Sequence, residues 1–290
     1  MGYKFIVKKE YEGKTLFVFL RSGAGISSSL IRSVKYDENG IRRNGARAKT
    51  NEIVKEGDEV EISPKAEDND LSPCGAVVPV VFENDDVIVF DKPAGMATHP
   101  TRNYKDGTLA NVYARILSER GERGSFHPTN RLDRNTSGLV LAAKNGLVTP
   151  ALAASAKKKY YAIVEGVFAD DAGRIDSPIG LADGSIIKRK VSPDGLPSST
   201  VFRVVKRFKE HTLLEVETLT GRTHQIRVHM SSIGYPLAGD ELYGGDEKYI
   251  KRQALHCAEI SFICPFKEEH ISLVSRLPDD MLKLIEGEKL

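Results

Sequence analysis

The stretch RLDRNTSGLVLAAKN, residues 131–145, places one carboxylate, Asp133, between two guanidinium groups, Arg131 and Arg134. Two cations close to an aspartate favour its ionised form. An ionised carboxylate can orient a substrate, bind a cation, or attack an electrophile as a covalent nucleophile. The same three residues also fit an ordinary surface ion pair, which contributes about 0–1 kcal/mol to stability. Alone, the stretch leaves both interpretations open.

The elements expected around Asp133 are mainly strands. The pattern of β-branched and aromatic residues predicts strands within 80–93, 138–144, 159–168, 201–208, 211–219 and 254–263. Helical spacing of apolar residues predicts helices within 107–120, 224–234 and 278–290. Because the strands follow one another through short links, they predict a mixed α+β domain with a largely antiparallel sheet and flanking helices.

A domain boundary is expected at residues 66–76, AEDNDLSPCGA, which are acidic and small, contain Pro and Gly, and show no hydrophobic periodicity. We therefore divide the chain into residues 1–65, a linker at 66–76, and residues 77–290. The first part is expected to hold a strand, two short helices and a hairpin centred on Asn44-Gly45. It has 13 Lys/Arg against 9 Asp/Glu, a net charge of +4, which is weakly indicative of a polyanion-binding module.

Composition excludes several classes of protein. With 290 residues, 40% hydrophobic and 28% charged, the chain has the composition of an ordinary globular protein. Its longest apolar run, at 77–82, is far shorter than the roughly 20 residues that span a bilayer, and residues 1–10 lack the apolar stretch of a signal peptide. We therefore expect a cytoplasmic protein without a membrane segment.

Metal binding is not expected from the cysteines or histidines. Cys74, Cys257 and Cys264 have spacings that fit neither a disulfide framework nor a paired-cysteine zinc site, so we expect reduced, structural thiols. His224 and His229 are five residues apart with no intervening glutamate, unlike the metalloprotease motif.

Four segments in this order resemble the RluA-type pseudouridine synthases, enzymes that convert selected uridines in RNA to pseudouridine. They are VIVFDKPAGMATHP (87–100), RLDRNTSGLVLAAKN (131–145), KKYYAIVEG (158–166) and LTGRTHQIRVHMSSIGYPLAGDELYGG (219–245). Residues 16–62 also resemble a degenerate alpha-L RNA-binding domain, through LFVFL, the Ile-Ser at 26–27, RRNGARAK and GDEVEI. The resemblance implies an RNA isomerase that needs no cofactor.

The resemblance also implies the catalytic residues. Asp133 corresponds to the nucleophile, Arg222 to the basic residue that pairs with it, and Tyr160 to the tyrosine that stacks under the target base. A carboxylate can attack the anomeric carbon or abstract a ribose proton to form a glycal, and the sequence does not distinguish these routes. Tyr161 lies on the opposite face of the same expected strand, so a slip of one residue would exchange the two tyrosines.

Other polar residues are candidate RNA contacts. Arg131 resembles the family arginine that enters the RNA where the base has been extruded, although an ordinary salt bridge remains an alternative. Arg134 fits either a phosphate contact or a fold contact. Asn130 replaces the histidine usual in the family, and its amide can still donate and accept hydrogen bonds. Lys92 in DKPAG fits a structural role near the cleft or a direct RNA contact. The candidate contacts in the first domain are Arg42, Arg43 and Arg47.

The resulting prediction is a monomeric RNA pseudouridine synthase whose expected target is large-subunit ribosomal RNA. Two alternatives concern the same fold: pseudouridylation of transfer RNA, and an RNA-binding protein without catalysis. A third is a glycosidase, but that chemistry usually needs two carboxylates about 5–9.5 Å apart, and these motifs offer no second acid.

Overall fold

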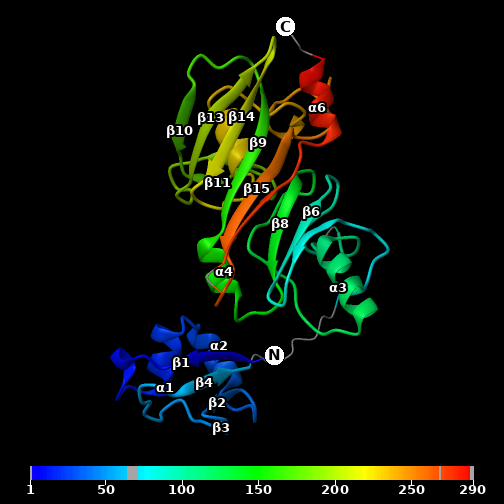
Figure 1. Cartoon of the computed structure of the whole chain (residues 1–290). Coiled ribbons are helices and arrows are strands. Elements are labelled where there is room, and N and C mark those ends of the chain that lie inside the picture. The colour runs from blue at the N-terminus through cyan, green and yellow to red at the C-terminus, as the bar shows by residue number, and fades with distance from the viewer. Residues whose placement is uncertain (1, 64–70, 103, 268, 288–290) are drawn as a thin grey trace.

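The computed structural model describes residues 2–63, 71–102, 104–267 and 269–287. The chain forms a small N-terminal unit, residues 2–63, and a large unit, residues 71–287, which can be told apart in Figure 1. Each has its own β-sheet. No helix among the described residues is both long and apolar enough to cross a membrane.

The N-terminal unit is a four-stranded antiparallel sheet covered by short helices. Its strands pair in the order β1-β4-β2-β3. They are β1 (Tyr3–Ile6), β2 (Ile41–Arg43), β3 (Ala46–Arg47) and β4 (Glu59–Ile62), and the helices are α1 (Leu16–Val18) and α2 (Ser28–Val34). The predicted hairpin is confirmed: Asn44 and Gly45, between β2 and β3, have φ angles of 51° and 81°, as a type I′ turn requires.

The large unit is built on a ten-stranded, mostly antiparallel sheet, which confirms the predicted α+β class. Its main path runs β10-β13-β14-β9-β15-β8-β6-β5, with β16 on β15 and β7 on β8. The strands are β5 (Val80–Glu83), β6 (Val87–Lys92), β7 (His127–Pro128), β8 (Ser137–Ala143), β9 (Lys157–Glu165), β10 (Ala172–Asp176), β13 (Ser199–Arg207), β14 (His211–Thr218), β15 (Leu255–Ile263) and β16 (His270–Val274). A separate hairpin pairs β11 (Ile179–Leu181) with β12 (Arg189–Val191).

Among the described residues of the large unit, four α-helices accompany this sheet. They are α3 (Leu109–Arg120), α4 (Thr149–Ser155), α5 (Gln225–Ser232) and α6 (Asp279–Glu286). The sequence predicted α3, α5 and α6 but not α4, which is only seven residues long and carries a proline in its first turn. Helices α3 and α6 lie beside different parts of the sheet in Figure 1.

Strand β8 fixes the end of the loop that carries Asp133. All seven of its residues are buried, as expected for the apolar run LVLAA between two neighbouring strands. At its first residues β8 pairs in parallel with β15, where Gly138 lies opposite Cys257. A Cβ atom at Gly138 would lie 2.3 Å from the carbonyl oxygen of Cys257, and its φ is 109°, so only glycine fits there.

The predicted linker is described only in part, because residues 66–70 lie outside the described residues. Its second half packs on the large unit: Asn111 of α3 donates a hydrogen bond from Nδ2 to the carbonyl oxygen of Ser72 at 2.9 Å. The two units also touch. The hydroxyl of Tyr3 donates to Asp86 at 2.5 Å, and the rings of Tyr3 and Phe266 lie 5.2 Å apart.

Candidate active site

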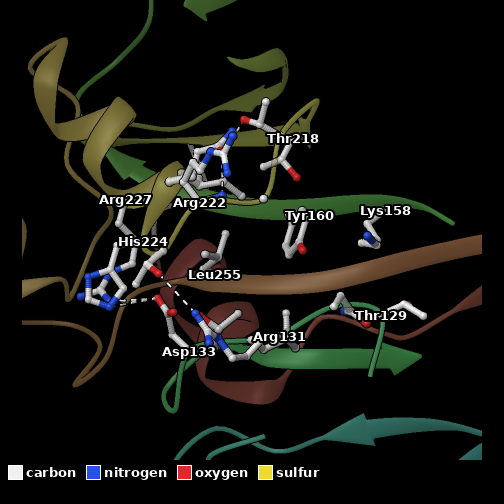
Figure 2. Close-up of a pocket in the computed structure, with 18 of the residues that line it drawn as sticks. Thr129, Arg131, Asp133, Lys158, Tyr160, Thr218, Arg222, His224, Arg227 and Leu255 are labelled. Carbon is white, nitrogen blue, oxygen red and sulfur yellow. Dashed lines mark hydrogen bonds and ion pairs between the residues drawn. The ribbon is translucent and has the colours of Figure 1, made fainter. Parts of the chain in front are cut away.

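A cavity of about 520 Å³ opens over the middle of the large sheet. Most of its lining comes from the loop between β7 and β8, strand β9, and the segment from the end of β14 into α5, and Ala153, Ala156 and the β15 residue Leu255 also line it. Figure 2 shows Asp133, Tyr160, His224 and Arg227 around this cavity, although they come from distant parts of the sequence. A cavity of this size can hold an extruded nucleotide.

Asp133 lies at the start of a tight turn. The backbone N–H of Thr136 donates to the carbonyl oxygen of Asp133 at 3.0 Å, which closes the turn just before β8 begins. The Asp133 side chain is 24% exposed, and its Oδ2 accepts a hydrogen bond from Nη1 of Arg227 at 3.0 Å. Nε2 of His224 lies 3.8 Å from the same oxygen. Asp133 also lines the cavity.

Arg227 is held by a second carboxylate. Its Nε and Nη2 donate to the two oxygens of Asp240 at 2.7 and 2.8 Å, and both side chains are buried. Burial opposes the charge of Arg227, but the hydrogen bond and charge of Asp240, together with Asp133, raise its pKa above the usual value for arginine. Arg227 is therefore a fixed cation that orients Asp133, and its anchor on Asp240 does not depend on Asp133.

The predicted partner of Asp133 was Arg222, and this pairing is wrong. Arg222 precedes α5 in an exposed loop, and its Nε donates to the carbonyl oxygen of Pro197 at 3.1 Å. Figure 2 shows it on the far side of the cavity from Asp133. Arg227 instead lies in the buried stretch of α5, QIRVHM. An arginine inside such an apolar stretch needs a buried acid, and this was the signal that could have identified it.

The two arginines beside Asp133 in the sequence do not pair with it either. Arg131 donates from Nη2 to Oγ1 of Thr223 at 3.3 Å, across the cavity. Arg134 donates from Nε to the carbonyl oxygen of Gly95 at 2.9 Å, and its guanidinium lies over the ring of Tyr104. Arg134 is therefore a fold contact, whereas Arg131 is exposed at the rim of the cavity.

Asn130 and Lys92 both make contacts that hold the fold, and Asn130 also lines the cavity. Asn130 is buried; its Nδ2 donates to the carbonyl oxygen of Leu139, and its Oδ1 accepts from the N–H of Leu141. The amide thus holds the loop to β8. Lys92 is fully buried, and its Nζ donates to carbonyl oxygens of Pro93 and Met96 and, at 3.3 Å, of Arg134. Burial lowers the pKa of Lys92 to about 7, although nearby Asp133 opposes this shift.

Tyr160 lines the cavity from β9, and Tyr161 does not. Because successive side chains of a strand point to opposite faces, Tyr161 packs instead against a separate apolar cluster that includes Ile163 and Met281. Tyr160 is buried, and burial raises its pKa well above 10. The structure therefore places Tyr160 at the site, in the register that the sequence predicted. Lys158, two residues earlier, also lines the cavity and was not predicted to belong to the site.

His224 was weighed only as a metal ligand, and no metal site was expected there. The structure shows that His224 faces Asp133. It precedes α5 with a φ of 58°, and its Nδ1 lies 2.8 Å from the hydroxyl of Tyr243. Burial lowers the pKa of His224, while the charge of Asp133 opposes this shift. His229 is buried elsewhere, against Thr200 and Ser177. In the described part of the chain no three His, Cys, Asp or Glu residues are grouped as metal ligands.

The sequence and the fold both match known pseudouridine synthases. Residues 86–232 match the family model described as RNA pseudouridylate synthase. Among curated proteins, an uncharacterized RNA pseudouridine synthase YjbO of Bacillus subtilis is 37% identical, and the match covers 97% of this chain and 98% of that protein. Ribosomal large subunit pseudouridine synthase D of Haemophilus ducreyi is 35% identical over 87% of this chain and 82% of that protein.

A solved structure supports the fold. Human RNA Pseudouridylate Synthase Domain Containing 1 superposes with a TM-score of 0.57 and 23% sequence identity, covering 70% of this chain and 85% of that chain. At this identity the likeness concerns the fold rather than any individual side chain.

Proposed function

The chain belongs to the RluA type of RNA pseudouridine synthases, and we propose that it acts on large-subunit ribosomal RNA with Asp133 as its nucleophile. The observation that carries the assignment of Asp133 is its ion pair with Arg227 at the cavity. The choice of ribosomal RNA is supported by the printed name of the Haemophilus ducreyi relative.

The reaction exchanges one bond of the nucleoside for another. The C1′–N1 bond of uridine breaks, the base turns, and a C1′–C5 bond forms; the hydrogen on C5 is lost and N1 gains a proton. Asp133 either attacks C1′ through Oδ1 or removes a ribose proton to form a glycal. Both routes need an oriented carboxylate. Arg227 orients Asp133 by donating a hydrogen bond to its Oδ2.

The cavity walls suit an extruded uracil. Tyr160 offers an aromatic face on one side, and Leu255 of β15 adds apolar surface. Removing a base from an RNA stack costs a few kcal/mol, and stacking on an aromatic ring offsets part of this cost. Arg131 at the rim is suitably placed to contact the RNA that the base has left, because its side chain is exposed beside the cavity.

The proposed substrate is tested by mapping pseudouridine in total RNA from cells that lack the protein. The cells are complemented with the wild type or with Asp133→Asn. We expect sites in large-subunit ribosomal RNA to vanish in the deletion and to return only with the wild type. Sites that vanish from transfer RNA instead would replace the substrate assignment. Sites restored equally by Asp133→Asn would overturn the role of Asp133.

The N-terminal unit is proposed to add affinity for RNA. Arg42 and Arg47 of its hairpin are exposed. Arg43 differs, because it is ion-paired with Glu52 at 3.3 Å, whereas Arg47 donates to the carbonyl oxygen of Tyr36. Of the three predicted contacts, Arg42 and Arg47 are thus the better candidates for binding phosphate.

The double variant Arg42→Gln/Arg47→Gln should weaken RNA binding and flatten its salt dependence. Each lost phosphate contact lowers the slope of log K against log salt by roughly one. Binding titrations at several salt concentrations measure this slope. The control is Arg174→Gln, an exposed arginine paired with Asp176 on β10 of the large unit. A double variant with the wild-type slope would remove the hairpin from the RNA-binding surface.

A further inference from the structure

Side chains of other segments hold the turn that carries Asp133 through hydrogen bonds. They bind successive residues of the turn: Thr98 Oγ1 donates to the carbonyl oxygen of Leu132, Lys92 Nζ to that of Arg134, Arg252 Nη1 to that of Asn135, and Gln253 Nε2 to the hydroxyl of Thr136. The distances are 3.1, 3.3, 3.1 and 3.2 Å. The position of Asp133 is therefore set by hydrogen bonds from side chains that do not line the cavity.

Arg252 is the most heavily committed of these side chains. Besides Asn135, its Nη1 reaches the carbonyl oxygens of Gln253 and Leu255, at 3.1 and 3.3 Å. Its Nε and Nη2 donate to the carboxylate of Asp280 at 2.6 and 2.8 Å. The Arg252 side chain is only 8% exposed. Because its donors are used inside the protein, Arg252 does not serve as an RNA contact.

Asp280 connects this arrangement to the C-terminal helix. It lies in the first turn of α6, where its Oδ1 also accepts the backbone N–H of Met281 at 2.9 Å. Burial opposes the charge of Asp280, but the hydrogen bond from Arg252 and the N–H groups of the helix lower its pKa below the usual value. The core of this helix is anchored independently, through buried Met281 and Leu284.

We propose that Arg252 and Asp280 are positioning residues, which set the Asp133 turn from the C-terminal helix and so control the rate of the reaction. The proposal rests on the proposed function of Asp133. A planar guanidinium held at two edges is rigid, so Asp280 fixes the plane in which Nη1 meets Asn135. Nucleophiles must be held within about 0.5 Å of the productive geometry, and a displacement of about 1 Å can cost 10²-fold in rate.

The test uses the single-turnover rate constant at saturating enzyme with an RNA that contains the target uridine. Asp280→Asn keeps the shape of the side chain but places an amide N–H₂ against a guanidinium N–H. We expect this change to lower the rate constant about tenfold and to leave the RNA dissociation constant unchanged, with Asp280→Glu recovering part of the rate. The control is Asp279→Asn, the same charge change in the same helical turn at an exposed residue, expected within twofold of the wild type.

This readout separates positioning from stability, because unfolding of a fraction of the enzyme does not change the rate constant of the folded, saturated complex. Thermal unfolding of each variant sets an assay temperature at which the folded form predominates. An Asp280→Asn rate equal to that of Asp279→Asn, or a loss found only in RNA affinity, would overturn the proposal. Failure of the proposed function is distinguishable, since the wild type would then show no conversion.

Discussion

Replacing Asp133 with Asn is expected to abolish uridine conversion while the protein still folds and binds RNA. An amide cannot act as the nucleophile or as the base, and removing a nucleophile can lower a rate by about 10⁴-fold or more. The side chain keeps its volume, and its amide oxygen can still accept from Arg227. Arg227 also retains both hydrogen bonds to Asp240, so no buried cation loses all its partners. We therefore expect a stability change of only about 1 kcal/mol.

The measurement is release of tritium from RNA labelled at C5 of uridine, because the new C1′–C5 bond displaces that hydrogen. RNA affinity is measured in parallel by titration. The matched control is Asp171→Asn on an exposed carboxylate outside the cavity, which pairs only at the surface with Arg207. Asp133→Asn with more than about one hundredth of the wild-type rate would contradict a covalent or proton-abstracting role, since either role should cost far more.

The sequence was most informative where local pattern determines structure. The hairpin at Asn44-Gly45 follows from two residues that tolerate positive φ. The period of a strand places the side chains of Tyr160 and Tyr161 on opposite faces of β9. The choice of Tyr160 rather than Tyr161 came from the family resemblance, and the structure has Tyr160 lining the cavity. Asp133 stood out within one short stretch, but its role as a nucleophile came from the resemblance of four separated segments to the family.

The pairing of charges could not be predicted in the same way. Arg227 is 94 residues from Asp133, and only the packing of α5 against the turn decides that it, rather than Arg222, meets the carboxylate. Lys92 ends a strand with the sequence of an exposed residue, yet three backbone carbonyl oxygens satisfy its ammonium group in the interior. The local sequence around each of these residues does not encode its distant partner, so the pairing of Asp133 with Arg222 was wrong and the role of Lys92 was left open.

The correction at Arg227 leads to the second large effect. Arg227→Gln should lower the free energy of unfolding by about 3–5 kcal/mol, the cost of removing one member of a buried ion pair. The reason is Asp240, whose side chain is 1% exposed and would be left buried without its bidentate partner. The rate constant should also fall, by about 10²-fold, because Asp133 loses the cation that orients it. Arg222→Gln, on an exposed residue bound to one carbonyl oxygen, should cost less than 1 kcal/mol.

The double variant Arg227→Gln/Asp240→Asn distinguishes the structural role of Arg227 from its catalytic one. Replacing both partners removes the unpaired charge, so urea unfolding should show that much of the lost stability returns. Tritium release should remain slow, because neither new side chain supplies a cation to Asp133. Recovery of the rate together with stability would mean that Arg227 acts only through the fold. Recovery of stability alone would show that the charge beside Asp133 is itself required for the reaction. The two carboxylates would then have different roles: Asp240 anchors Arg227 in the fold, and Asp133 depends on Arg227 for its orientation.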